Sequence, residues 1–307
     1  MARPDLSASP AARALAVVAV VGLALAVVAL TVLALQRDTS LDPAAATPAP
    51  VPSFSFRGSD TPPPSATPSD APPLPATSGA GERFLAQSSE GTLWRATAGA
   101  CDGEEPLVER SDDAGQTWAD VTPRYRGIER VRALYGFSGT EAEMVVDLAG
   151  CEAEWLRTFT QGNFWELYPE LLEQATYPSL DAPAVLVTPG GDVPLPCPAP
   201  SSIRIGSQQT ALVCDGVPQV RVGSAPWTPL PVDQVVAVDV LGRSTAVARV
   251  DPEACADGLA LAWIDDDAAV TPAGCLDAAD PAVPTAVAAL DDILIVWSGD
   301  RVETFTR

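Results

Sequence analysis

The sequence predicts an all-β protein: a β-propeller of six degenerate blades, preceded by one transmembrane helix and a Pro-rich linker. Three observations predict this architecture. Residues 81–307 consist of short β-type runs separated by Gly, Pro and Asp turns. These runs recur in units of about 40 residues with four strands each, a spacing typical of propeller blades. Residues 14–35 are apolar almost throughout, and residues 36–80 are rich in Pro, Ser, Thr and Ala.

Charge and composition exclude several classes of function. The chain has 307 residues, with 40 acidic and 18 basic side chains and a net charge of −22. Every basic residue is Arg, so the chain contains neither Lys nor His. The absence of His excludes Ser–His and Cys–His catalysis and His-ligated zinc. The acidic balance repels polyanions, so we expect no nucleic-acid partner.

The N-terminal region predicts a membrane anchor. After a short cytoplasmic N-terminus (residues 1–13), the apolar run Ala14–Leu35 is long enough as a helix, at about 33 Å, to cross a bilayer. A cleaved signal peptide is the alternative, but its apolar region is only about 7–15 residues long. Arg3 and Arg13 before the span, against Arg37 after it, place the N-terminus inside. We expect a single-pass plasma-membrane protein with an extracellular C-terminal domain.

Residues 36–80 predict an extended linker of the polyproline type, because their Pro content is incompatible with helix or central strand. One segment differs: Ser53–Arg57 alternates Ser and Phe with period two, as a half-buried strand does. It is either a strand or two isolated aromatic residues in the linker.

The propeller domain is expected over residues 81–307. Its units are predicted from strand-like runs that begin near 93, 144, 210, 246 and 293. Ala184–Val187 and Asp192–Leu195 resemble a shorter blade, which makes six units, or five if this region is a loop. The last unit has room for three strands. Because a ring must close without a long bare edge, Ser53–Arg57 is the predicted fourth strand.

One hairpin motif carries most of the fold prediction, the segment from Ser111 to Trp118. Asp113 is placed to accept hydrogen bonds from turn amides, and Gly115 supplies a position for positive φ. Ser111 and Thr117 are short hydroxyls that bond locally, and Trp118 offers a ring to bury between sheets.

The pattern Ser/Thr-x-Asp-x-Gly-x-Thr-Trp in this segment resembles the Asp-box (BNR) repeat of β-propellers. That family includes sialidases, sortilin-type luminal domains and photosystem II stability-factor-like proteins. Thr158, Gly162 and Trp165 align with the motif as a second copy in which Thr160 replaces the Asp. The resemblance implies a structural clamp near the rim of a propeller.

The six cysteines predict three disulfides, because an exported domain without His or Cys-x-x-Cys favours bridges over metal. Aligning the units places four cysteines at the ends of second strands and two in links between blades, all on one face and opposite the hairpin clamp. The predicted pairs are Cys101–Cys151, Cys197–Cys214 and Cys255–Cys275.

A cluster of arginines is the one candidate binding patch. It comprises Arg124, Arg126, Arg130 and Arg132, which lead from a link between blades into an innermost strand. Arg side chains bind carboxylates and phosphates well. The alternative is that these guanidinium groups only offset neighbouring acidic residues.

The sequence contains no signature of catalysis, a metal or a cofactor. The acidic runs 102–105, 265–267 and 291–292 lack the spacing of a calcium loop, and nucleophile elbows and phosphate loops are absent. The Arg-Ile-Pro segment and the catalytic set of sialidases find no counterpart. We therefore expect a non-enzymatic module that binds an envelope protein or glycan. A sialidase-like or other glycoside hydrolase is the alternative, and fold analogy adds an assembly chaperone.

Overall fold

A computed structural model describes residues 79, 81–179 and 184–307 of the chain. The predicted helix 14–35, the predicted closing strand Ser53–Arg57 and, apart from Gly79, the predicted linker 36–80 lie outside the described residues. Within the described ranges, no helix has both the length and the apolar character to cross a membrane.

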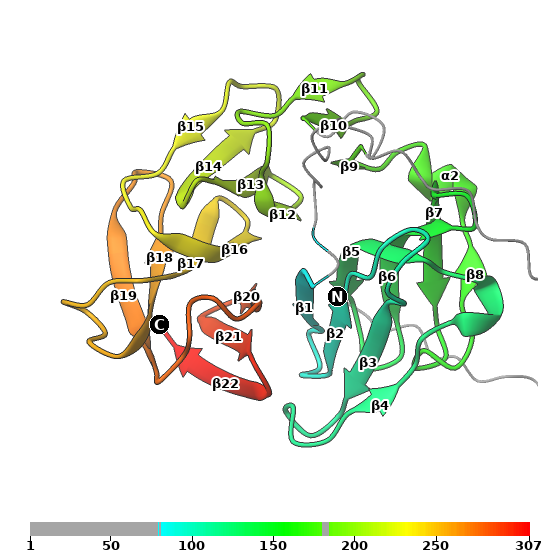
Figure 1. Cartoon of the computed structure of the whole chain (residues 1–307), viewed down its shortest axis with the longest axis horizontal. Coiled ribbons are helices and arrows are strands. Elements are labelled where there is room, and N and C mark those ends of the chain that lie inside the picture. Colours follow the sequence, from blue (N-terminus) through cyan, green and yellow to red (C-terminus); the bar gives the residue numbers. More distant parts are fainter. Residues whose placement is uncertain (1–78, 80, 180–183) are drawn as a thin grey trace, which may run out of the picture. The chain divides into compact units, whose positions relative to one another are not determined.

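The described residues form six antiparallel sheets arranged in a ring (Figure 1), which confirms the prediction of a six-bladed propeller. Blade 1 comprises β1 (Arg83–Gln87), β2 (Leu93–Thr97), β3 (Leu107–Ser111) and β4 (Ala119–Asp120). Blade 2 comprises β5 (Arg130–Gly136), β6 (Ala142–Leu148), β7 (Glu152–Thr158) and β8 (Glu166–Leu167). Blade 3 comprises β9 (Tyr177–Pro178), β10 (Val185–Val187) and β11 (Val193–Pro194).

The second half of the ring is more regular. Blade 4 comprises β12 (Ser201–Ile205), β13 (Gln209–Cys214), β14 (Val217–Val222) and β15 (Thr228–Pro229). Blade 5 comprises β16 (Val235–Leu241), β17 (Ser244–Arg249), β18 (Gly258–Ile264) and β19 (Val270–Asp277). Blade 6 comprises β20 (Thr285–Leu290), β21 (Ile293–Ser298) and β22 (Arg301–Thr306). Two short helices, η1 (Arg124–Arg126) and α2 (Pro169–Leu172), lie in the links that follow blades 1 and 2.

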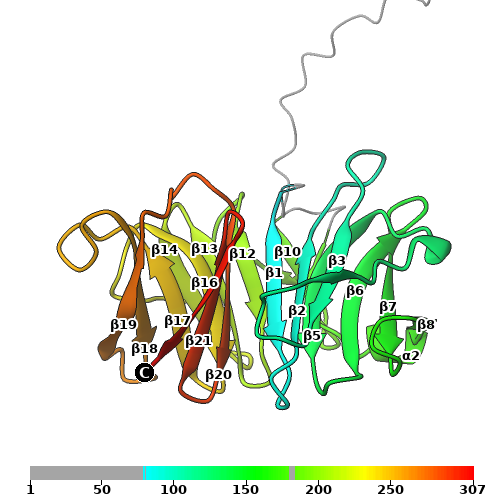
Figure 2. The ribbon, with the colours of Figure 1, turned by 90° about the horizontal axis from the view of Figure 1, so that it is seen from below.

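The strands of each blade run roughly along the axis of the ring, so their connecting loops divide between two faces (Figure 2). Each strand pairs antiparallel with its neighbour in sequence. Loops after second strands and links between blades therefore emerge on one face, and loops after first and third strands emerge on the other.

Burial falls from the inner strands to the outer strand of each blade, and the sequence reflects this gradient. The second strands are sandwiched between neighbouring sheets, and β6 and β13 are buried over nearly their whole length. A strand covered on both faces needs apolar residues at consecutive positions. The outermost strand β22, by contrast, is exposed or half-buried throughout.

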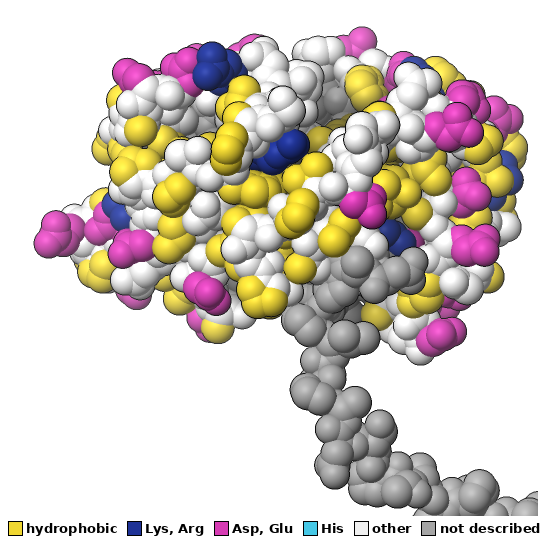
Figure 3. Space-filling view, turned by 90° about the horizontal axis from the view of Figure 1, so that it is seen from above, with side chains coloured by type: hydrophobic (Ala, Val, Ile, Leu, Met, Phe, Trp, Pro, Cys, Tyr) yellow, Lys and Arg dark blue, Asp and Glu magenta, His cyan; other side chains and the backbone are white. Residues whose placement is uncertain are grey.

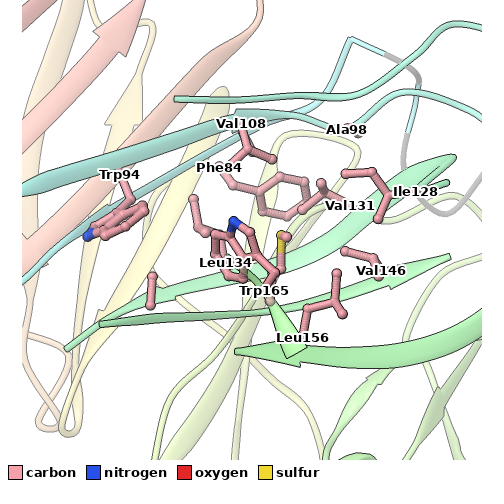
Figure 4. Close-up of a cluster of buried hydrophobic side chains, with 13 residues drawn as sticks. Phe84, Trp94, Ala98, Val108, Ile128, Val131, Leu134, Val146, Leu156 and Trp165 are labelled. Atoms are coloured by element: carbon pink, nitrogen blue, oxygen red, sulfur yellow. The ribbon is translucent and has the colours of Figure 1, made fainter. Parts of the chain in front are cut away.

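A cluster of buried side chains joins blades 1 and 2 (Figure 4). Trp94 on β2 and Trp165 before β8 are both fully buried, with their ring centroids 6.1 Å apart in an edge-to-face arrangement. Phe84 of the innermost strand β1 belongs to the same cluster. Such aromatic pairs stabilise by about 0.5–1.5 kcal/mol beyond the burial of their area.

Candidate functional site

The structure does not bring the four arginines of the predicted patch together on one surface. Arg124 and Arg126 lie in η1, the link between β4 and β5. Arg124 is exposed and donates to the Asp120 carboxylate at 2.8 Å. Arg126 donates to the carbonyl of Trp165 at 2.9 Å, and its guanidinium lies over two exposed aromatic rings.

Arg130 and Arg132 are buried in β5. Nε of Arg132 donates to Asp147 at 2.6 Å, and Nη1 donates to the carbonyl of Pro178 at 2.8 Å. Asp147 is 0% exposed, so this ion pair lies inside blade 2, and the hydrogen bond to Pro178 of β9 ties blade 2 to blade 3. Burial lowers the pKa of Arg130. These two arginines hold the fold together, and only the η1 pair is accessible.

The hairpin that resembles an Asp-box is closed by hydrogen bonds within itself. Oδ1 of Asp113 accepts from the Thr117 amide at 2.8 Å, and Oδ2 accepts from the Thr117 hydroxyl at 2.6 Å. The Ser111 hydroxyl accepts from the Gly115 amide at 2.9 Å, where Gly115 has φ of +85°. These bonds, led by those from Thr117, lower the pKa of Asp113 to about 2. The carboxylate is fully used in shaping the turn.

The second copy keeps the same geometry without the acid. The Thr158 hydroxyl accepts from the Gly162 amide at 3.1 Å, and the Thr160 hydroxyl accepts from the Phe164 amide at 2.9 Å. Gly162 has φ of +82°, and a Cβ there would meet Val121 at 2.6 Å. A hydroxyl therefore serves in this hairpin where the first copy has a carboxylate.

The three predicted disulfides are all present, as Cys101–Cys151, Cys197–Cys214 and Cys255–Cys275. One placement was wrong: Cys275 lies within the outer strand β19, opposite Ala260, and not in the link that follows. β19 is longer than the other fourth strands and absorbs residues that the sequence assigned to a link. Strand direction places the bridges toward one face and the Asp113 hairpin on the other.

An open cavity of about 540 Å³ lies on the axis of the ring. Five innermost strands, β1, β5, β12, β16 and β20, reach it with residues near their C-terminal ends. A volume of this size suits a small ligand, since such pockets span about 300–1,000 Å³.

Blade 3 explains why the cavity exists. The residues that precede β9, Gln174–Thr176, line the cavity, so β9 starts where the other innermost strands end. β9 therefore runs antiparallel to the first strands of the other blades and has the direction of their second strands. Figure 1 shows this blade set back from the centre of the ring. The described residues supply no first strand to blade 3, and the cavity occupies the adjoining space.

The cavity wall combines an aromatic platform with polar groups. Tyr135 of β5 and Trp155 of β7 stack with centroids 5.8 Å apart and ring planes 12° from parallel. Among the described residues, Oε1 of Gln87, Nε1 of Trp155 and Nε of Arg204 are buried without a hydrogen-bond partner. All three residues line the cavity. Six further buried atoms without a hydrogen-bond partner in the described residues belong to side chains outside this lining. Unpaired buried polar atoms are costly, so the three at the cavity mark points where a polar ligand or water would find a partner.

Burial perturbs the acidic groups of the cavity. It raises the pKa of Asp239 to about 6. Two contacts oppose this rise in pKa: the Ala289 amide donates to Oδ2 at 2.8 Å, and the positive charge of Arg204 favours the carboxylate. Burial also raises the pKa of Tyr135. The pKa of Glu143 rises for the same reason, although Arg157 at 3.1 Å opposes the rise. Perturbed acids in a cavity are typical of functional sites.

Arg204 separates this cavity from a second one of about 370 Å³ at the other end of the axis, and it lines both. Its Nη2 donates to the carbonyl of Arg83 at 2.6 Å, and its Nη1 lies 3.3 Å from Glu82. The guanidinium also lies over Phe84, 4.8 Å from the ring centroid. These contacts link blade 4 to blade 1 and close the axis.

Metal binding has little support among the described residues. The two groups of side chains with ligand atoms close enough to share an ion each contain a disulfide-bonded cysteine pair. A disulfide offers no thiolate, so each group is left with one carboxylate.

The sequence did not point to the residues of the axial cavity. Tyr135, Trp155, Asp239 and Gln87 belong to no motif and come from three blades. The available signal was the shortness of the unit that contains Ala184–Leu195, because a blade with too few residues leaves space beside the axis.

No family model matches the chain, and no curated protein matches it. Among solved structures, the chain is similar to YCF48 bound to D1 peptide, with 13% identity, a TM-score of 0.25, and coverage of 70% of this chain and 59% of that chain. The chain is also similar to the PQQ-bound aldose sugar dehydrogenase from Streptomyces coelicolor, with 13% identity, a TM-score of 0.41, and coverage of 76% of this chain and 95% of that chain. A third similar structure is the Aleuria aurantia lectin in complex with Fucα1-6GlcNAc, with 10% identity, a TM-score of 0.36, and coverage of 72% of each chain. The pairing of its own strands defines the chain as a six-bladed β-propeller with a cavity on the axis.

Proposed function

We propose that the chain is a membrane-anchored, extracytoplasmic binding module whose axial cavity takes a sugar unit of an envelope glycan. The anchor is the apolar run Ala14–Leu35, and the three disulfides suit an oxidising compartment outside the membrane. The observation that carries the proposal is the stacked pair of Tyr135 and Trp155 beside unpaired polar atoms in one cavity.

The chemistry of this wall suits a sugar ring. A pyranose has apolar C–H faces and a rim of hydroxyls, so it needs a flat aromatic surface and several fixed hydrogen-bond partners. Trp155 supplies the surface, while Gln87 and the Asp239 carboxylate supply acceptors. Above a pH of about 6 Asp239 is ionised and accepts hydroxyl donors strongly.

Binding is tested with the full-length protein in detergent, using an oligosaccharide pool prepared from the envelope glycans of the producing cells. We expect Trp155→Leu and Asp239→Asn each to weaken retention of the pool about tenfold, as for the loss of one stacking or charged contact. The matched control is Phe164→Leu, an aromatic residue that is 49% exposed outside the cavity. Equal retention by all four proteins contradicts the proposal, and capture of an envelope protein instead of sugar identifies the other kind of partner.

Glycoside hydrolysis is the second candidate function. Asp239 and Glu143 line the same cavity, and the pKa of each is raised by burial. Two carboxyl groups with perturbed pKa values are what glycoside hydrolysis requires. Against it, the pKa of Tyr135 is raised, which disfavours the phenolate that a tyrosine nucleophile needs.

The two functions separate in one assay. A hydrolase releases reducing ends from the oligosaccharide pool over time, and Asp239→Asn abolishes the release. A binding module retains the pool unchanged. Release that persists in both Asp239→Asn and Glu143→Gln excludes these carboxyl groups as the catalytic pair.

A further inference from the structure

Arg221 differs from every other arginine among the described residues. The others each make an ion pair, a hydrogen bond or a contact with an aromatic ring. Within the same part of the chain, no such partner is present for the side chain of Arg221. The protein has a net charge of −22, and Figure 3 shows acidic side chains outnumbering basic ones on the side that it presents. A half-buried guanidinium without an acidic partner is therefore unexpected.

Arg221 lies in a groove of about 390 Å³ between blades 3 and 4. It belongs to β14, where it is paired with Thr210 of β13, and both residues line the groove. The other walls are the β10–β11 turn, which contains Gly190 and Gly191, and the β12–β13 turn. The lining combines hydroxyl, amide and glycine-backbone groups with the apolar side chains of Leu186, Val193 and Ile205, so the groove offers both hydrogen bonds and apolar contact.

The groove adjoins the axial cavity. Thr176, Ile205, Gly206 and Ser207 line both spaces. A Cβ at Gly206 would meet Val240 at 2.7 Å, so the backbone approaches β16 closely at this junction. A ligand that occupies both spaces would have to pass along this shared wall.

We propose that the ligand is an acidic oligosaccharide whose first unit occupies the axial cavity and whose next unit places a carboxylate against Arg221. The inference rests on the glycan-binding function proposed above and adds the length and charge of the ligand. A guanidinium presents two parallel N–H donors that match the two oxygens of a carboxylate. Asp192 also lines the groove but makes no ion pair with Arg221 among the described residues, which leaves the guanidinium available.

The two parts of the site have different tasks. Around the axial cavity the arginines are already engaged, as in the contacts of Arg204 with Glu82 and the carbonyl of Arg83. An anionic group there meets Asp239 and Glu143 and is repelled. The groove reverses this preference, because Arg221 is the one arginine in its described lining and has no partner among the described residues. Discrimination between acidic and neutral glycans is therefore assigned to Arg221.

The test uses the full-length protein in detergent and two matched probes. One is the acidic oligosaccharide fraction of the producing cells' envelope, and the other is the same fraction after carbodiimide–borohydride treatment, which converts carboxylates to primary alcohols and leaves the rings unchanged. We expect the untreated fraction to bind about ten- to a hundredfold more tightly, as for a charge-assisted contact. Arg221→Gln removes this preference, and raising the salt concentration reduces it.

Arg301→Gln is the matched control, because it makes the same charge change at an exposed site on blade 6. It should keep the preference for the carboxylated fraction. Equal binding of both fractions by the unsubstituted protein, with loss of both in Trp155→Leu, overturns the role of Arg221 and leaves the proposed function standing. Failure of both fractions to bind overturns the inference and the proposed function together. A preference that survives in Arg221→Gln places the carboxylate elsewhere and also overturns the inference.

Discussion

Replacing Asp239 with Asn should make the protein more stable at neutral pH. The carboxyl lines the axial cavity, and its burial raises the pKa from 3.8 to about 6. In the folded protein the proton is therefore bound more tightly than in the unfolded chain. The stability that this proton confers is fully present below pH ~4 and is lost as the pH rises through ~6.

The size of the effect follows from the shift. A change of about two pKa units corresponds to about 3 kcal/mol, at ~1.36 kcal/mol per unit. Asparagine is neutral at every pH, and its carbonyl accepts from the Ala289 amide as Oδ2 of Asp239 does. Asp239→Asn should therefore gain up to about 3 kcal/mol at pH 7, or ~6–12 °C in Tm for a domain of this size.

Urea unfolding of the two proteins between pH 4 and pH 8, with the disulfides intact, measures this difference directly. The gain should grow from pH ~4 to ~6 and then stay constant. Asp233→Asn, at an exposed acidic residue, serves as the control and should leave the profile unchanged. A gain that does not depend on pH, or a loss of stability at pH 7, refutes the idea that burial dominates at Asp239.

Three further outcomes concern the parts that hold the propeller together. Arg132→Ala should destabilise by about 3–5 kcal/mol in denaturant unfolding, because it leaves the buried Asp147 carboxylate without its guanidinium. Asp113→Ala should remove stability that is present above pH ~4 and lost toward pH ~2, since the folded pKa of Asp113 is lowered; acid unfolding curves of the two proteins should converge near pH 2. Replacing Cys197 and Cys214 together by Ser should lower the free energy of unfolding by about 2–4 kcal/mol. The denaturant midpoint should fall, and reductant should no longer lower it through this bridge.

The repeat pattern was sufficient to predict the blades, because strand periodicity and turn residues act locally. Buried second strands such as β6 and β13 carry continuous apolar runs that stand out in the sequence. Aligning the blades placed all six cysteines toward one face, and the three pairs predicted among them are present in the structure. Cys275 was misplaced because the length of an outer strand depends on packing at the rim, which the sequence pattern does not record.

The arginines show where pattern reasoning stops. Four arginines in nine residues form a conspicuous cluster, but a sequence does not say which side chains a strand buries. The Asp147 carboxylate on β6 takes Arg132 into the interior, while Arg221, which belongs to no cluster, lies in a groove without a partner among the residues that the structure describes. Availability of a charge depends on its neighbours in space.

The sequence by itself predicted the class of fold and the disulfide pairs, which the structure confirms, and it excluded His-dependent chemistry, since these depend on composition and short-range pattern. The anchor and the linker stay predictions. Only the tertiary structure decided the site. The direction of β9 leaves blade 3 without a first strand among the described residues, and a cavity is found there. Residues far apart in sequence, such as Gln87, Tyr135 and Asp239, meet because ring closure brings the ends of the innermost strands together. Ring closure is a property of all blades at once, so no single segment encodes it.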